Sequence, residues 1–235
     1  MRSVIFDLDG TLADTSADLI AAANACLSGM GAAVLLDPAA DAAIAFRGGR
    51  AMLRAGLARA GAGERAGAGA GAGAGDGADE AEVERWYPRL LDAYEARIDA
   101  ETRLYPGAVE AAEALRRAGL AVGVCTNKPE RLARLLLARL GVADTFSALV
   151  GADTLPVRKP DPAPFHEAVA RAGGMRGRAM LVGDTVTDRD TARAARAPVA
   201  LVTFGPEGRA VADLAPDALL DAYEALPGLA ARLLP

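Results

Sequence analysis

The sequence predicts an α/β protein in which a doubly wound parallel sheet is interrupted by an inserted helical domain. Short apolar runs alternate with stretches of helical periodicity, the pattern of a parallel sheet covered by helices. Four polar clusters follow these runs or lie on loops between the alternating elements. Parallel sheets bind ligands where the carboxyl ends of their strands meet, so these clusters are the candidate site.

The N-terminal segment predicts a buried strand, a tight turn and a helix. Val4-Ile5-Phe6 is an apolar run that ends at Asp7, and Asp9-Gly10-Thr11 is a turn sequence. Asp14 or Thr15 can cap a following helix, in which apolar residues recur at helical spacing until two glycines stop it.

A mainly helical block then interrupts the alternation. From residue 37 to about residue 98 the apolar pattern is helical, with no clear strand. Residues 61–78 are an almost pure Gly/Ala repeat, which has too little side-chain area to offset chain entropy and therefore predicts a flexible surface insertion. We predict a core domain from residues 1–14 and 100–235, and an inserted helical domain over residues 15–99.

The alternation resumes after Tyr105-Pro106-Gly107. The predicted helices cover residues 108–118, 129–140, 164–172 and 187–196. The predicted strands cover residues 120–125, 179–182 and 199–202, and residues 149–150 form a further apolar run.

Composition excludes several classes of protein. The 235 residues include 26 Lys and Arg against 31 Asp and Glu, and a net charge of −5 argues against a nucleic-acid or membrane surface. No apolar run is long enough for a transmembrane helix and the N-terminus lacks a leader pattern, so we expect a cytoplasmic protein, monomeric or homodimeric. Cys26 and Cys125 lie far apart, which suggests neither a disulfide nor a zinc site.

The four polar clusters together indicate phosphoryl transfer. They are Asp7-Leu8-Asp9-Gly10-Thr11, Thr126-Asn127-Lys128, Lys159-Pro160-Asp161-Pro162, and Gly183-Asp184-Thr185 with Asp188. Gathered carboxylates require a cation, and oxygen ligands without His or Cys favour Mg²⁺. A lysine, a threonine hydroxyl and the amides of a Gly turn suit a phosphate group. A carboxylate held between metal and phosphate is a competent nucleophile, and a second can shuttle protons.

With these motifs in this order, the chain resembles the haloacid dehalogenase superfamily of phosphatases, which have a Rossmann-like core. The resemblance implies that Asp7 is the nucleophile and a metal ligand. It implies that Asp9 is the general acid and base and ligates the metal through its carbonyl. Asp184 would complete the metal site. Asp188 would support this site without binding the metal, by orienting its ligands or waters.

The same resemblance assigns the phosphate-binding and cap residues. Gly10, Thr126, Asn127 and Lys159 would bind the phosphoryl oxygens. The inserted helical block stands where this branch carries a cap that closes over the site and selects the substrate. There, Arg47 and Arg50 flank a Gly pair, and at least one of them is expected to contact an anionic substrate.

Three further stretches resemble phosphoglycolate phosphatases, which hydrolyse 2-phosphoglycolate with Mg²⁺. They are Thr126-Asn127-Lys128-Pro129, Lys159-Pro160-Asp161-Pro162 and Val202-Thr203-Phe204-Gly205. Arg196 stands where that family usually has a glycine. Alternatives are a phosphatase of a sugar phosphate, a nucleotide or pyrophosphate, a hexose phosphomutase, and a catalytically silent protein that binds a phosphorylated ligand.

Overall fold

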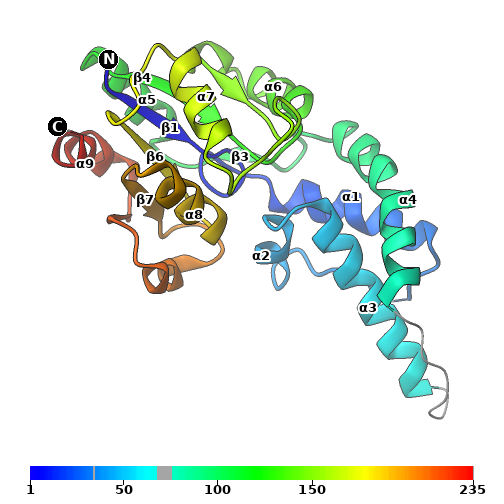
Figure 1. Ribbon diagram of the computed structural model, residues 1–235. Coiled ribbons are helices and arrows are strands. Elements are labelled where there is room, and N and C mark those ends of the chain that lie inside the picture. The colour runs from blue at the N-terminus through cyan, green and yellow to red at the C-terminus, as the bar shows by residue number, and fades with distance from the viewer. Residues whose placement is uncertain (34, 68–75, 235) are drawn as a thin grey trace. The chain divides into compact units, whose positions relative to one another are not determined.

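The computed structural model describes residues 1–33, 35–67 and 76–234, and the side chains of these residues except 61–67 and 76–79. The chain divides into two compact units. Met1–Asp14 with Arg103–Pro235 form the core unit, and Thr15–Thr102 form the inserted unit (Figure 1). The second boundary therefore lies three residues beyond the predicted one.

A six-stranded parallel sheet forms the centre of the core unit, in the order β5-β4-β1-β6-β7-β8. This order confirms the predicted doubly wound α/β class. The six strands are β1 (Ser3–Phe6), β4 (Ala121–Cys125), β5 (Leu149–Val150), β6 (Ala179–Gly183), β7 (Val199–Val202) and β8 (Ala218–Leu220).

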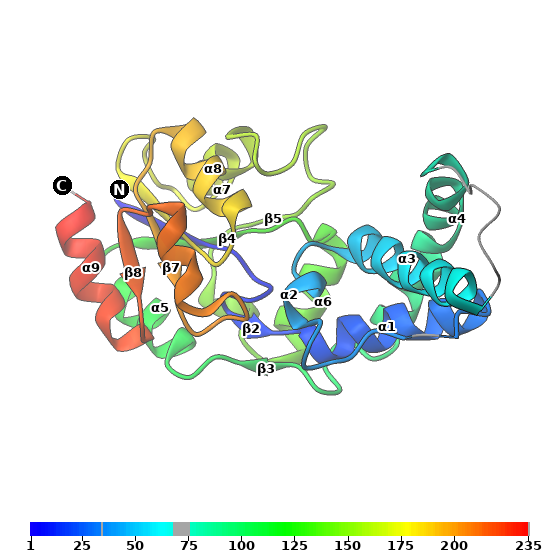
Figure 2. The ribbon, with the colours of Figure 1, turned by 90° about the horizontal axis from the view of Figure 1, so that it is seen from below.

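Helices cover both faces of this sheet (Figure 2). One face packs against α7 (Ala163–Arg171) and α8 (Val186–Ala195). The other packs against α5 (Ala108–Arg117), α6 (Glu130–Arg139) and α9 (Leu226–Leu233). Both faces are thus shielded from water, as a parallel sheet requires.

Three of the four residues of β1, Val4, Ile5 and Phe6, are apolar because both faces of the strand are buried. Side chains alternate between the two faces of a strand. Ile5 joins the apolar cluster that includes Phe165 of α7, whereas Phe6 packs with its ring centroid 5.9 Å from that of Phe146 and 6.5 Å from that of Tyr223. Since both faces are buried, an alternating polar pattern would leave polar groups without water, which explains the continuous apolar run from Val4 to Phe6.

The chain leaves and re-enters the core unit through two paired strands. β2 (Ala13–Asp14) and β3 (Arg103–Leu104) form an antiparallel pair. On the other side of each boundary, within the inserted unit, the fully buried Asp18 accepts hydrogen bonds from the backbone amide and the hydroxyl of Thr102, each at 2.9 Å. These bonds tie the first helix of the inserted unit to its last residues, which explains why that unit extends beyond residue 99.

The inserted unit is built from four helices in its described residues, with no strand among them: α1 (Ser16–Gly29), α2 (Ala42–Ala45), α3 (Gly49–Gly67) and α4 (Asp76–Glu95). The long helices pack closely because small residues stand at the contacts. A Cβ atom on Gly56 of α3 would lie 2.2 Å from Leu27 Cδ1 of α1. No described helix of either unit has the length and apolarity needed to cross a membrane.

The predicted elements are largely confirmed, with differences at the ends of the chain and of the helices. The Gly/Ala segment predicted as flexible over 61–78 is helical at 61–67 and 76–78, where it completes α3 and begins α4, and its middle lies outside the described residues. β8 and α9 were not predicted, nor were the two-residue strands β2 and β3.

Arg196 ends α8 in the left-handed conformation, with φ 54° and ψ 40°. Glycine adopts this conformation without a steric penalty, whereas a side chain makes it costly. The related family's glycine at this position therefore has a backbone reason, and the present chain forms the same turn with a less suitable residue.

Replacing Arg196 with glycine should raise the free energy of unfolding by about 0.5–1 kcal/mol, because it relieves the left-handed strain. Urea denaturation followed by circular dichroism measures this. Ala194→Gly is the matched control: Ala194 lies inside α8, so this variant should lose about 1 kcal/mol. Equal losses in both variants would contradict the explanation.

Candidate active site

The site forms where the carboxyl ends of three neighbouring strands meet. β4, β1 and β6 lie side by side and run in one direction, and they end immediately before Thr126, Asp7 and Asp184. One carboxylate oxygen from each of Asp7, Asp184 and Asp188 lies within 4.8 Å of the other two. The sheet therefore brings together the clusters that the sequence separates by more than a hundred residues.

Lys159 links two of these carboxylates. It lies on the loop between β5 and α7, and its buried ammonium is 3.0 Å from Asp7 Oδ1 and 2.6 Å from Asp188 Oδ1. Burial lowers the pKa of Lys159, but the Asp188 and Asp7 carboxylates outweigh it and raise the pKa above its usual value. Asn127 Nδ2 donates to the Lys159 carbonyl oxygen at 3.0 Å, which fixes the loop next to the end of β4.

Asp188 has both carboxylate oxygens engaged. Oδ1 accepts from Lys159, and Oδ2 accepts from the Thr185 amide at 3.1 Å, the Thr185 hydroxyl at 2.8 Å and the Asp184 amide at 3.3 Å. These donors include the backbone amide of Thr185, the N-cap residue of α8, so Asp188 also takes part in the capping box of that helix. A Cβ atom on Gly183 would lie 2.3 Å from Asp188 Cγ, so the close approach requires glycine there.

Asp184 has one oxygen bonded and one without a bond. Thr11 Oγ1 donates to Asp184 Oδ1 at 2.9 Å, and Tyr223 in turn holds the Thr11 carbonyl oxygen through a 2.8 Å hydrogen bond. Asp184 Oδ2 is buried and makes no hydrogen bond to any described residue. Burial and the carboxylates of Asp188 and Asp7 raise the pKa of Asp184 well above its usual value.

The ionised form of Asp7 is destabilised by burial in the same way. Burial raises its pKa to about 6, although the Lys159 ammonium opposes this shift. Three buried carboxylates face one ammonium, and a divalent cation would supply the missing positive charge. Because the donors are all oxygens and Asp184 Oδ2 is unused, the residues fit a hard cation. Asp188 has no unused oxygen, which makes Asp7 and Asp184 the carboxylates available to such an ion.

The predicted phosphate-binding residues have different placements. Thr126 is buried, and its Oγ1 accepts the Lys128 amide at 3.1 Å, which leaves the hydroxyl hydrogen to donate. Asn127 is exposed, and its side chain holds the Lys159 loop. The Gly10 amide, in contrast, donates to the Ala13 carbonyl oxygen at 2.9 Å. Gly10 has φ 80°, so it serves the turn through its backbone conformation, and its amide is already committed.

Lys128 is a residue of the site to which the sequence analysis assigns no role. Lys128 Nζ lies 2.7 Å from Asp9 Oδ1, and the Lys128 side chain is only 4% exposed. A count of residue types could have found it, because the chain contains only two lysines, Lys128 and Lys159, and both stand in the polar clusters.

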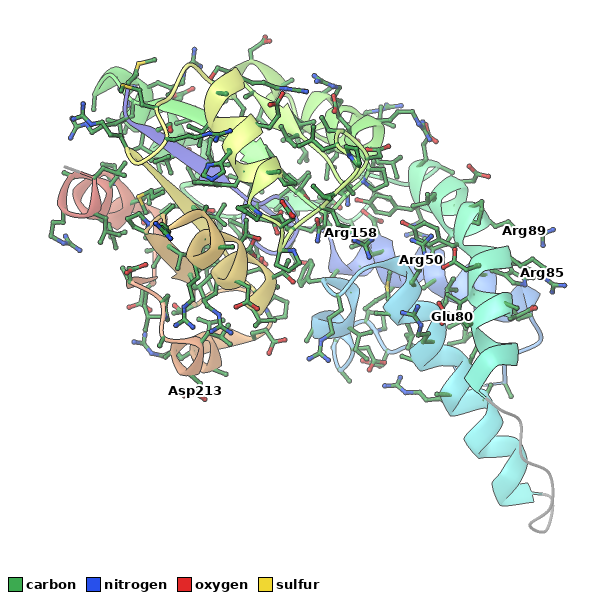
Figure 3. All side chains as sticks on the ribbon, in the orientation of Figure 1. Arg50, Glu80, Arg85, Arg89, Arg158 and Asp213 are labelled. Carbon is green, nitrogen blue, oxygen red and sulfur yellow. The ribbon has the colours of Figure 1, made fainter. Side chains whose placement is uncertain are left out.

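Arg47 and Arg50 belong to the inserted unit. Arg47 is exposed just before α3. Arg50, in the first turn of α3, donates through Nε and Nη2 to the two carboxylate oxygens of Glu84 on α4, and its guanidinium carbon is 3.6 Å from the centroid of the Tyr87 ring. Figure 3 labels Arg50 and Glu80 on these two helices. Arg50 therefore joins α3 to α4 whatever else it contacts.

An α/β sheet that gathers buried carboxylates, a lysine and a threonine hydroxyl at one edge defines an enzyme site for an anionic substrate and a cation. Comparisons identify its family. Residues 1–196 match the model of the haloacid dehalogenase-like hydrolases. A phosphoglycolate phosphatase of Mesorhizobium japonicum is 38% identical over 232 residues, which cover 98% of this chain and 96% of that protein. One of Rhodospirillum rubrum is 40% identical over 229 residues, or 96% and 89% of the two chains.

A solved structure agrees with these relatives. The crystal structure of a protein described as a predicted phosphoglycolate phosphatase from Haemophilus somnus matches with a TM-score of 0.80 and 25% identity, over 97% of each chain. The chain belongs to the haloacid dehalogenase-like hydrolases. Within that family it is a phosphatase.

Neutralising Asp7 should stabilise the protein without metal. A folded-state pKa of about 6, raised from 3.8, means that the folded protein binds more protons than the unfolded chain between these values, so stability falls as pH rises through this window. Asp7→Asn removes this penalty. In chelator, the variant should exceed the wild type in free energy of unfolding at pH 7.5, and the difference should shrink towards pH 4.

Urea denaturation at the two pH values measures the difference. Asp213→Asn is the control, because Asp213 is exposed on the core unit (Figure 3). This substitution changes the formal charge by the same amount as Asp7→Asn. Added Mg²⁺ should stabilise the wild type more than Asp7→Asn, by up to about 2.7 kcal/mol at a hundredfold excess over Kd. A wild type that is more stable than Asp7→Asn in chelator at pH 7.5 would contradict the explanation.

Proposed function

We propose that this phosphatase hydrolyses 2-phosphoglycolate to glycolate and inorganic phosphate through an aspartyl phosphate on Asp7. The observation that carries the chemistry is the Asp7 carboxylate held 3.0 Å from the buried Lys159 ammonium, beside an Asp184 oxygen that no hydrogen bond uses. The full-length relatives named phosphoglycolate phosphatase support the choice of substrate.

The two carboxylates of the first cluster divide the reaction between them. A bond forms from Asp7 to phosphorus as the bond from phosphorus to the glycolate oxygen breaks, and Asp9 gives its proton to that oxygen. Asp9 then takes a proton from the water that attacks phosphorus, and the bond to Asp7 breaks. Asp7 and Asp9 thereby return to their initial states.

The remaining residues hold the phosphoryl group and the cation. The Thr126 hydroxyl, Asn127 and the Lys159 ammonium would bind the phosphoryl oxygens, and Lys159 also offsets the charge of Asp7. Asp7, Asp184 and the Asp9 carbonyl would hold Mg²⁺, which when bound neutralises and orients the phosphoryl group. Asp188 keeps Lys159 and the start of α8 in place, a positioning role consistent with its fully used oxygens.

The inserted unit is the proposed cap. Its position in the chain, between β2 and β3, allows it to move relative to the core through two short connections. Substrate contacts would come from Arg47 or Arg50, since the carboxylate of 2-phosphoglycolate needs a cationic partner. The two bonds of Arg50 to Glu84 use Nε and Nη2, so a substrate contact would use Nη1.

Phosphate release from a panel of phosphomonoesters tests the reaction. In Mg²⁺, 2-phosphoglycolate should exceed phosphoserine, glucose phosphates and nucleotides in kcat/KM by at least a hundredfold, about 2.7 kcal/mol of transition-state discrimination. Asp7→Asn should abolish turnover, and Asp213→Asn should retain it. A flat profile would reject the substrate while keeping the phosphatase, and an active Asp7→Asn enzyme would reject the aspartyl phosphate.

Arginine variants test the cap. Arg47→Ala or Arg50→Ala should raise KM for 2-phosphoglycolate at least tenfold, about 1.4 kcal/mol, with a smaller effect on p-nitrophenyl phosphate, which has no carboxylate. Arg54→Ala is the matched control, because Arg54 makes the same two bonds through Nε and Nη2 to Glu80 one turn later in α3. If all three variants change KM equally, the result would reject a specific contact of Arg47 or Arg50 with the substrate carboxylate.

A further inference from the structure

Lys128 and Asp9 form a part-buried ion pair in the core unit. The Lys128 ammonium is 2.7 Å from Asp9 Oδ1, and the two side chains are 4% and 17% exposed. A lysine ammonium is strongly hydrated and is almost never buried without a partner. Its burial here is therefore compensated by the carboxylate that it faces.

The backbone of Lys128 is held on both sides. Its amide donates to Thr126 Oγ1 at 3.1 Å, and its carbonyl oxygen accepts the Ala152 amide at 3.0 Å. β4 and β1 pair with Phe6 opposite Val124, so the turns that follow the two strands lie next to each other. The turn that presents the Thr126 hydroxyl thus also directs Lys128 to Asp9.

The choice of lysine is specific to this site. Of the 26 basic residues only Lys128 and Lys159 are lysines, and all others are arginines. Lys159 contacts Asp7 and Asp188, whereas Lys128 contacts Asp9. An ammonium is a compact charge that fits beside one carboxylate oxygen, while a guanidinium requires a wider planar partner. Each reacting carboxylate therefore has its own ammonium.

We propose that Lys128 is a positioning residue for the general acid and base: it holds the Asp9 carboxyl group in the orientation that serves the leaving oxygen and the attacking water. The proposal rests on the phosphatase mechanism given above. When the ester bond breaks, its electron pair stays on the leaving oxygen, which takes the proton of Asp9. Asp9 is then the carboxylate paired with Lys128, the state that the ion pair in the structure represents, until it takes a proton from water.

Leaving-group dependence tests this role. An alkyl phosphate such as β-glycerophosphate needs a proton on its leaving oxygen, whereas p-nitrophenyl phosphate releases a stable anion that does not. Lys128→Met should therefore lower kcat/KM for β-glycerophosphate by about a hundredfold and for p-nitrophenyl phosphate by less than about fivefold. Asp9→Asn should give the same selective loss. A lysine that only supported the fold would lower both substrates equally.

A double variant separates positioning from other roles and protects the test against misfolding. Lys128→Met/Asp9→Asn removes both charges, so no unpaired buried carboxylate remains. It should be no slower than Asp9→Asn alone on either substrate, because Lys128 acts through Asp9. An additional loss in the Asp9→Asn background would overturn the proposal and indicate that Lys128 acts on the phosphoryl group. Equal losses of Lys128→Met on both substrates would overturn it in favour of a structural role.

Rejection of the phosphatase mechanism can be distinguished from rejection of the role of Lys128. Arg116→Met is the control for loss of an exposed cationic side chain, since Arg116 donates to the Asp144 carbonyl oxygen on the surface. A wild type without metal-dependent hydrolysis of either substrate would reject the phosphatase mechanism and this role with it. An active wild type whose Lys128→Met variant keeps the normal ratio of the two rates would reject the role alone.

Discussion

The concentration of buried negative charge at the end of the central strands is the constraint on which this structure depends. Asp7 and Asp184 directly follow the neighbouring strands β1 and β6, and Asp188 lies in the first turn of α8, which follows β6. Without compensation their repulsion and desolvation would open that edge of the core. Lys159 supplies one positive charge from a loop on the far side of β4, and the residues around it are arranged to keep it there.

The bonds that relieve this charge also build the local fold. Asp188 holds Lys159 with one oxygen and the first turn of α8 with the other, so the helix starts where the charge is balanced. Thr11 orients Asp184 and is itself held by Tyr223, from the C-terminal part of the chain. The site is therefore positioned by the same contacts that close the core, and the raised pKa of Asp7 shows that its ionised form remains costly without a cation.

The inserted unit is stabilised by different interactions from those of the core unit. It has no sheet in its described residues, and its helices are joined by close approaches at glycine and by paired ions such as Arg50 with Glu84 and Arg54 with Glu80. Exposed pairs of this kind contribute little each. The fully buried Asp18 does more, since it closes the unit by bonding Thr102.

The sequence alone determined the α/β class, most helices and strands, and the polar clusters that gather at the ends of the central strands, because apolar periodicity and turn residues are local properties. Asp7, Thr126, Lys159 and Asp184 were found in this way. Tertiary structure decided which atoms of these residues already have hydrogen-bond or ion-pair partners. It showed that Asp188 is fully bonded, that the Gly10 amide is taken and that Lys128 faces Asp9. Lys128 and Asp9 lie 119 residues apart and Thr11 and Asp184 lie 173 residues apart, and only strand order brings such partners together.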